Sequence, residues 1–305
     1  MPRRGWTRAA SHAGSWYSND GTRLRMRLSE WVDKVHEGSD EYDGRPVENL
    51  RAIIAPHAGY EYSGSTAAHA YAGIDPAKYK RVIVLGPSHH QYLDDCALSA
   101  ASSFETPLGT LKADEQLVEE LYSSGQFHYM SSSVDEAEHS IELHLPYVAY
   151  IFRKYLSTIK VVTVLVGALS EDVEEKYGGI FSRYLQDPET LFIVSSDFCH
   201  WGRRFRFTYV GEHREEIYEA IERLDRMGIS LIEKQEPRQF LAYLRKYSNT
   251  ICGRHPIAVL LFALEECKRI NAQFTVKFVR YRQSSQCKSK TDSSVSYASA
   301  HISQY

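Results

Sequence analysis

Three short segments each place a histidine after an apolar, strand-like run of the chain. The runs and their histidines are residues 51–56 with His57, residues 81–87 with His89, and residues 191–196 with His200. Ligands and catalytic groups of an open α/β sheet gather in the crevice beyond the carboxyl ends of its strands. If the three runs are parallel neighbours, one crevice holds three imidazoles and the carboxylate of Asp197. That set predicts a metal site or an acid–base site.

The first two segments also allow plainer explanations. Pro56 fixes the backbone where the first strand ends and Gly59 permits an unusual turn, so His57 is held as rigidly as a metal ligand needs to be. A histidine that caps the following turn would give the same pattern. Adjacent residues at a strand end point in different directions, so at most one of His89 and His90 faces the site. The alternative is that both lie in a solvated loop.

In the third segment, Asp197 and His200 lie three residues apart. An aspartate can accept a hydrogen bond from an imidazole and set its tautomer. We therefore expect His200 to act as a general acid/base or a ligand, with Asp197 behind it or beside it. The alternative is a capping aspartate beside a packed pair of His200 and Trp201.

Cys252 precedes an apolar, helix-like run. A helix N-terminus lowers the pKa of a thiol, and Arg254 would lower it further, so a thiolate here could bind a metal or react. The alternative is a small buried apolar side chain, which suits Cys267 better because Cys267 lies inside a predicted helix.

Two further segments carry polar and aromatic residues. Glu138, His139 and Glu142 have the spacing of a helical metal site. The favoured interpretation is that Ser140 and the nearby acidic residues cap a helix. A direct or indirect role of this segment at a metal stays open. Residues 11–17 combine His, Gly and aromatic residues, and fit a pocket rim or a packed N-terminal arm equally well.

Composition excludes some classes of function. The 305 residues carry a net charge of −3, which gives no positive field for nucleic acid. No apolar run approaches the roughly 18 residues of a membrane span, and no apolar segment follows the N-terminal arginines. The five cysteines form no CxxC pair, which argues against a disulfide framework. We expect a cytoplasmic protein without membrane insertion, with the nucleus as a second compartment.

The elements that must position these residues alternate between strands and helices. This alternation predicts an α/β fold with a central, mostly parallel or mixed sheet flanked by helices, in a single domain over residues 1–305. Residues 37–49 are predicted to form a polar surface loop. The strands are predicted at 50–55, 81–86, 161–166, 191–196, 274–282 and 295–301, and the helices at 22–35, 64–73, 113–123, 140–155, 171–185, 212–224, 237–247 and 257–270.

On these residues the chain resembles the Memo family, named for mediating cell motility driven by a receptor tyrosine kinase of the epidermal growth factor receptor class. The resemblance runs nearly end to end, and the 37–49 stretch is where the chain looks longer and more polar than the family leads us to expect. The segments that carry it are residues 11–17, 53–60, 85–90, 139–147, 164–170, 195–202, 249–257 and 292–298.

Memo proteins resemble class III extradiol dioxygenases in fold, and those enzymes hold iron(II) with two histidines and a glutamate. The resemblance implies that His57 and His89 are metal ligands and that Cys252 replaces the carboxylate. It also implies that His200 stands at the acid/base position, with Asp197 in the same pocket. A thiolate is a softer ligand, so this set suits copper or zinc at least as well as iron(II), and we do not carry over ring-cleaving dioxygenase activity.

Three functions follow as hypotheses. The first is a copper- or iron-binding redox protein, a candidate oxidoreductase, that influences reactive oxygen species and relays receptor tyrosine kinase signals to the cytoskeleton and cell migration. The second is a non-enzymatic adaptor that binds phosphotyrosine-containing receptor or adaptor peptides and cytoskeletal signalling proteins. Its aromatic and basic residues include Trp16, Trp201, Arg203 and Arg204, although a solvated face explains the arginines as well. The third is a zinc hydrolase with an activated water at a His₂Cys site.

Overall fold

Four parallel strands form the centre of a twelve-stranded sheet in the computed structural model, which describes residues 5–37, 45–211 and 215–305. Nearly every residue of these strands is buried, as expected for parallel strands covered on both faces. Their order across the sheet is β8 (Lys160–Val166), β3 (Arg81–Pro87), β9 (Thr190–Ser195) and β2 (Leu50–Ala55).

Antiparallel strands extend the sheet on both sides, so the sheet is mixed. On the β2 side, β12 (Ser294–Gln304) pairs antiparallel with β2 and with β11 (Phe274–Gln283). The remaining strands are short, and they are β1 (Thr7–Arg8), β4 (Cys96–Leu98), β5 (Ser103–Phe104), β6 (Leu111–Ala113), β7 (Phe127–Tyr129) and β10 (His200–Trp201). The predicted fold class is therefore confirmed as a single α/β domain with a large, mostly parallel sheet between helices.

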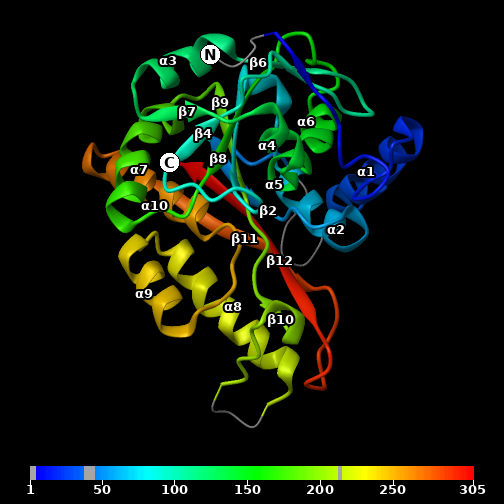
Figure 1. The fold of residues 1–305 in the computed structure, drawn as a ribbon, viewed down its shortest axis with the longest axis vertical. Coiled ribbons are helices and arrows are strands. Elements are labelled where there is room, and N and C mark those ends of the chain that lie inside the picture. Colours follow the sequence, from blue (N-terminus) through cyan, green and yellow to red (C-terminus); the bar gives the residue numbers. More distant parts are fainter. Residues whose placement is uncertain (1–4, 38–44, 212–214) are drawn as a thin grey trace.

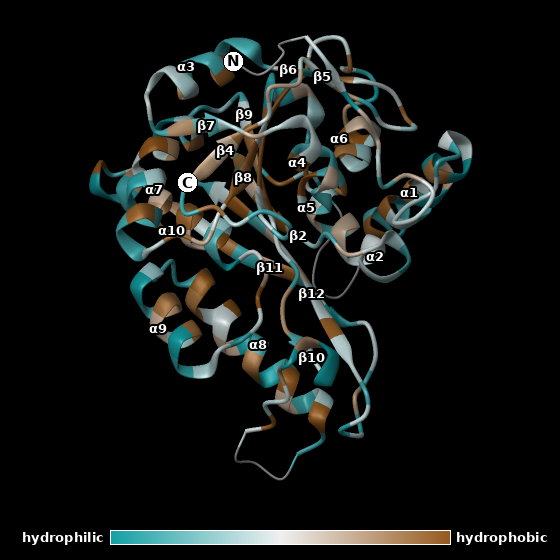
Figure 2. Ribbon diagram, viewed as in Figure 1, coloured by the Kyte–Doolittle hydropathy of each residue, from teal (hydrophilic) through white to brown (hydrophobic). Residues whose placement is uncertain are grey.

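Helices cover both faces of the sheet (Figure 1). Alternate residues of a strand face opposite ways, so Ile54 packs in one apolar core and Ile53 in the other. The core of Ile54 includes α7 (Glu171–Leu185), α8 (Ile217–Glu233), α9 (Pro237–Tyr247) and α10 (Arg254–Arg269). The core of Ile53 includes α1 (Gly21–His36), α2 (Tyr60–Tyr71) and α6 (Leu145–Ile151). Figure 2 shows apolar colouring in the central strands and hydrophilic colouring on the outer faces of the helices.

One predicted helix is divided in the structure. The run 140–155 forms α5 (His139–Glu142) and then α6, with α4 (Ser132–Ala137) before them. Pro146 is the reason, because a proline inside a helix lacks an N–H group and its ring clashes with the carbonyl four residues earlier, which is that of Glu142. The chain therefore turns after Glu142, and Pro146 sits in the first turn of α6.

Most other predicted elements have close counterparts in the structure, including α3 (Glu115–Ser123). The helix predicted at 212–224 begins at Ile217, and residues 212–214 lie outside the described part of the chain. Of the predicted 37–49 loop, residues 38–44 also lie outside it, while residues 45–49 enter β2 without helix or strand. Among the described helices, none combines the length and apolar composition needed to cross a bilayer.

Candidate metal centre

Three of the predicted site residues follow three adjacent parallel strands at the same offset. His89, Asp197 and His57 are each the second residue after the end of a strand, namely β3, β9 and β2. Because β9 lies between β3 and β2 and pairs with both in parallel, the three strand ends meet at one edge of the sheet. The expectation that these strands are parallel neighbours is confirmed.

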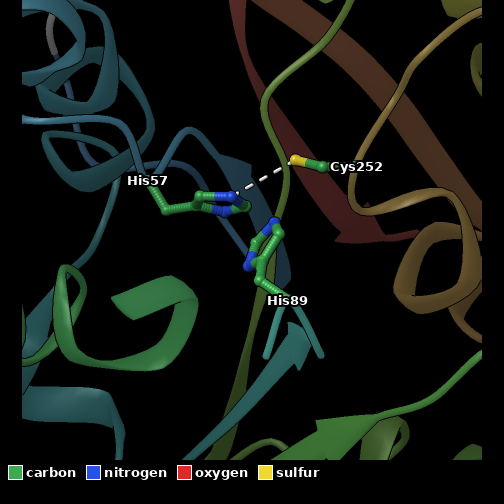
Figure 3. A group of neighbouring side chains, drawn as sticks. All are labelled: His57, His89 and Cys252. Atoms are coloured by element: carbon green, nitrogen blue, oxygen red, sulfur yellow. Dashed lines mark hydrogen bonds between the residues drawn. The ribbon is translucent and has the colours of Figure 1, made fainter. Parts of the chain in front are cut away.

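Cys252 reaches the same edge from the turn before α10. The ligand atoms of His57, His89 and Cys252 lie within 4.8 Å of one another, close enough to hold one metal ion. Figure 3 shows the three side chains pointing toward one another, with the Sγ atom of Cys252 3.2 Å from Nε2 of His57. The ring centroids of His57 and His89 are 5.2 Å apart. His57 is buried whereas His89 is exposed, so the cluster is open on the His89 side.

Hydrogen bonds fix the tautomer of His57. Its Nδ1 atom lies 2.6 Å from the Oγ atom of Ser195, the last residue of β9. The hydroxyl of Ser195 donates its proton to the carbonyl of Ser140 at 2.7 Å, so it must accept a proton from Nδ1 of His57. Nε2 is then the nitrogen that keeps its lone pair, and it faces Cys252. The pKa of His57 is well below its usual value because of burial and the neighbouring imidazoles, which keeps the ring neutral as a ligand requires.

A carboxylate fixes His89 in the same way. Oε1 of Glu138 accepts from Nδ1 of His89 at 2.9 Å, and Oε2 accepts from the backbone N–H of His89 at 2.7 Å. Burial raises the pKa of Glu138, but the hydrogen bonds from His89 and Ser140 outweigh it and hold the pKa at about 2. The carboxylate therefore accepts the Nδ1 proton and leaves Nε2 of His89 for a metal. A carboxylate behind a ligand histidine is a common support in metal sites.

Asp197 and His200 lie beside this cluster. A second group of possible ligand atoms joins Asp197, His200 and Cys252 within 4.8 Å. Oδ1 of Asp197 accepts from the backbone N–H of His57 at 2.9 Å, so this carboxylate holds the loop that carries His57. Nδ1 of His200 faces the carbonyls of Phe198 and Thr250 at 2.9 and 3.1 Å, and these carbonyls, not Asp197, set the tautomer of His200. We expected Asp197 either behind His200, as its hydrogen-bond acceptor, or beside it, and the structure places Asp197 beside His200.

The expected lowering of the Cys252 pKa is wrong for this structure. Burial raises the pKa of the thiol well above its usual value, and the charge of Asp197 raises it further. The backbone N–H of Asp197, which lies 3.2 Å from Sγ, and the charge of Arg254 act in the expected direction but are weaker. A bound divalent cation deprotonates a coordinating thiol, so the buried thiol remains a competent ligand.

The segment around residue 140 has a supporting role that the sequence only partly indicated. Glu138, not Ser140, caps α5, and the same carboxylate holds His89. Glu142 points elsewhere and accepts from His12, Tyr17 and Arg8, at 2.7, 2.8 and 2.6 Å. Helix capping, the favoured interpretation of this segment, is confirmed, and Glu138 and Glu142 serve different groups. Sequence reasoning missed the roles of Ser195 and Thr250, because a hydroxyl at a strand end or in a loop carries no distinctive signal.

The N-terminal segment is both a packed arm and a pocket rim. Tyr17 is buried, whereas Trp16 is 36% exposed and lines a cleft of about 500 Å³. Tyr62, Arg204 and Tyr297 line the same cleft, which also borders the turn after His57. Of the two adjacent histidines after β3, His89 enters the metal cluster and His90 does not.

The donor set fits a metal ion. Two imidazoles and one thiol converge, and hydrogen bonds fix both imidazoles with Nε2 as the free nitrogen. Nitrogen and sulfur ligands suit copper, zinc or iron and disfavour magnesium and calcium.

Comparisons with known proteins place the chain in a family. A family model described as "Memo-like protein" matches residues 8–301. Protein MEMO1 of Xenopus laevis is 52% identical over 302 residues, and Protein MEMO1 of Homo sapiens is 50% identical over 302 residues, each match covering 99% of both chains. The Protein memo-1 homolog of Caenorhabditis elegans is 44% identical over 96% of this chain and 81% of its own.

A solved structure supports the fold alone. The crystal structure of an uncharacterized protein from Escherichia coli K12 superposes with a TM-score of 0.50 at 10% sequence identity. It covers 81% of this chain and 98% of its own.

Proposed function

This chain belongs to the Memo family, and from that premise we propose that it binds one copper or iron ion through His57, His89 and Cys252 and acts in the redox chemistry of reactive oxygen species. The observation that carries the proposal is the convergence of the three ligand atoms within 4.8 Å, with both imidazoles fixed by groups behind them. We propose that residues 1–305 form a single domain that carries this function.

The metal would supply one-electron chemistry when bound, and the protein's own groups handle protons and access. His200 donates from Nδ1 to backbone carbonyls, so its Nε2 accepts or returns a proton at the centre. Asp197 lies within the same group of side chains, and burial raises the pKa of its carboxyl group, as a residue that exchanges protons requires. The two residues therefore serve as the acid/base pair of the proposed site.

The biological setting is part of the proposal. Five free cysteines, without a disulfide in the described residues, suit a reducing compartment, so we place the protein in the cytoplasm, with the nucleus as a second location. There it would relay receptor tyrosine kinase signals to the cytoskeleton and cell migration.

Metal content after anaerobic purification tests the first function. We expect one equivalent of copper or iron in the wild type and loss of the metal in Cys252→Ser. The control is Cys267→Ser, which should keep the metal because Cys267 is buried in α10 away from the cluster. Peroxide production on admission of oxygen should follow the metal. A wild-type protein that takes up neither metal would contradict the proposal, and tightly held zinc with ester or amide hydrolysis would favour the hydrolase.

A peptide-binding adaptor is the second candidate, and the cleft beside the centre favours it. Trp16, Tyr62 and Tyr297 offer aromatic surface, and Arg204 offers a cation for a phosphate. Arg204→Ala should weaken binding of a phosphotyrosine peptide about tenfold or more, because a hydrogen bond to a charged group contributes about 1.5–3 kcal/mol. Arg25→Ala, an exposed arginine on α1, is the control. Equal affinity for phosphorylated and unphosphorylated peptide would count against the adaptor.

A further inference from the structure

Three stacked aromatic rings connect the proposed metal centre to the protein surface. The ring of His139 lies on the ring of His89, with centroids 4.5 Å apart and planes inclined by 20°. The indole of Trp16 in turn stacks on the ring of His139, with centroids 4.4 Å apart and planes inclined by 26°. Neither Trp16 nor His139 belongs to the proposed ligand set, so the metal-binding function described above gives the stack no role.

The backbone holds this stack in place at both ends. His139 is the first residue of α5, directly after Glu138, whose carboxylate holds His89. The backbone N–H of Tyr60 donates to the carbonyl of Trp16 at 2.9 Å, which ties the N-terminal arm to the start of α2. The backbone of Trp16 is thereby held at a site where 36% of the residue is exposed, and the ring contact with His139 orients the indole.

We propose that Trp16 is the surface terminus of a one-electron relay, in which an electron passes from its indole through the ring of His139 to His89. Electron tunnelling falls off exponentially with distance, so rings in van der Waals contact make the most favourable route between a metal ligand and the surface. The inference rests on the proposed function, because it requires a redox metal on His89.

Tryptophan suits the terminus better than the buried phenols of Tyr60 and Tyr147 do. Oxidation of a phenol requires loss of its proton at the same time, whereas an indole can lose an electron first and its N–H proton afterwards. Tyr60 and Tyr147 are buried, and their hydroxyls donate to backbone carbonyls at 2.6 and 2.7 Å, which are poor proton acceptors. Burial raises the pKa of both phenols well above the usual value. Trp16 can release its proton to water instead.

The relay completes the reduction of hydrogen peroxide. Conversion of one peroxide to two waters breaks the O–O bond and takes two electrons, with two protons that come from water. Bound copper(I) or iron(II) would supply only one of these electrons, and without a second electron half of the peroxide would leave as hydroxyl radical. Trp16 gives the second electron and becomes an indole radical cation, which loses its N–H proton to solvent. Two equivalents of a one-electron reductant of the ascorbate type would then restore the indole and return the metal to its reduced state.

Rapid freezing after one equivalent of peroxide tests the relay in the copper(I)- or iron(II)-loaded full chain, with dimethyl sulfoxide present to remove free hydroxyl radical. We expect an indole radical by electron paramagnetic resonance and oxygen addition at Trp16 by peptide mass spectrometry. Trp16→Phe should lose both signals at unchanged metal content. In a parallel sample without dimethyl sulfoxide, it should release more hydroxyl radical to a spin trap. His139→Leu removes the middle ring, and should reduce oxidation of Trp16 several-fold at unchanged metal content. Trp6→Phe, a substitution elsewhere in the N-terminal segment, should behave as the wild type.

The outcomes separate this inference from the function on which it rests. A protein that takes up no redox metal overturns both. A protein that binds the metal and consumes peroxide, but leaves Trp16 unmodified or places the radical on a tyrosine, overturns the relay alone. Equal oxidation of Trp16 in the wild type and in His139→Leu also overturns it, because the electron would then bypass the middle ring.

Discussion

The ring of His57 takes its orientation and its protonation from Ser195, whose Oγ atom lies 2.6 Å from Nδ1. The hydroxyl proton of Ser195 is committed to the carbonyl of Ser140, so the serine can only accept from the imidazole. The last side chain of β9 thus determines which nitrogen of a residue on β2's loop faces the thiol of Cys252.

Removing the hydroxyl of Ser195 should therefore weaken metal binding without removing a ligand. For Ser195→Ala we expect a loss of about 10–100-fold in copper affinity, since partners behind a ligand histidine commonly contribute that much. A titration against a competing chelator measures it. Ser182→Ala, which removes a hydroxyl that donates within α7, is the control. Unchanged affinity in Ser195→Ala would show that the ring keeps its orientation without the serine.

Thr250 joins the loop of Cys252 to the segment of His200. Its Oγ1 accepts from the backbone N–H of His200 at 2.7 Å and donates to the carbonyl of His200 at 3.0 Å. Thr250→Val keeps the shape but leaves that N–H unpaired, and should lower the free energy of unfolding by about 1–3 kcal/mol. Thr250→Ser keeps the hydroxyl and should lose much less. Urea denaturation compares them, and equal stability of the two variants would contradict this account.

The buried carboxylate of Glu142 should make the N-terminal arm sensitive to acid. Burial raises its pKa, but the hydrogen bond from His12 and the charge of Arg8 outweigh burial and lower the pKa from 4.5 to about 2. A lowered pKa contributes stability that is complete above the unfolded value and is lost as the pH falls through the folded value. The stability advantage of the wild type over Glu142→Gln should therefore shrink by up to about 3 kcal/mol between about pH 5 and pH 2.

Urea denaturation of both proteins at several pH values measures this change. Glu136→Gln is the control, because Glu136 meets the same arm through the backbone N–H of Ala9 but is not part of the pair with Arg8. If the difference in free energy of unfolding between the wild type and Glu142→Gln stayed constant across this pH range, the carboxylate would have the same pKa in the folded and unfolded chains.

Two adjacent glycines of α7 should respond in opposite ways to alanine. A Cβ atom on Gly178 would lie 2.5 Å from Cβ of Phe262 and 2.8 Å from the backbone N of Ala263, so α10 would have to move. A Cβ atom on Gly179 would meet nothing within 4 Å. We expect Gly178→Ala to cost about 1–3 kcal/mol and Gly179→Ala to add up to about 1 kcal/mol, as alanine favours a helix. Thermal unfolding tests the pair, and similar melting temperatures would contradict the close packing of α7 on α10.

The sequence by itself determined the fold class, the central strands and the candidate ligands. Continuous apolar runs are typical of strands buried on both faces, and the strand expected at 50–55 is β2. His57, His89 and Asp197 could be selected because each follows such a run. The apolar pattern predicts one helix over 140–155, whereas Pro146 divides this run into α5 and α6.

Only the tertiary structure decided how these residues meet. Strand order is not encoded locally, and β9 comes to lie between β3 and β2 through contacts far apart in the sequence. The partners that fix each imidazole, Ser195 for His57 and Glu138 for His89, lie 138 and 49 residues from them. The pKa of Cys252 was mispredicted for the same reason: the helix terminus is local, whereas the burial that outweighs it arises from packing of the whole domain.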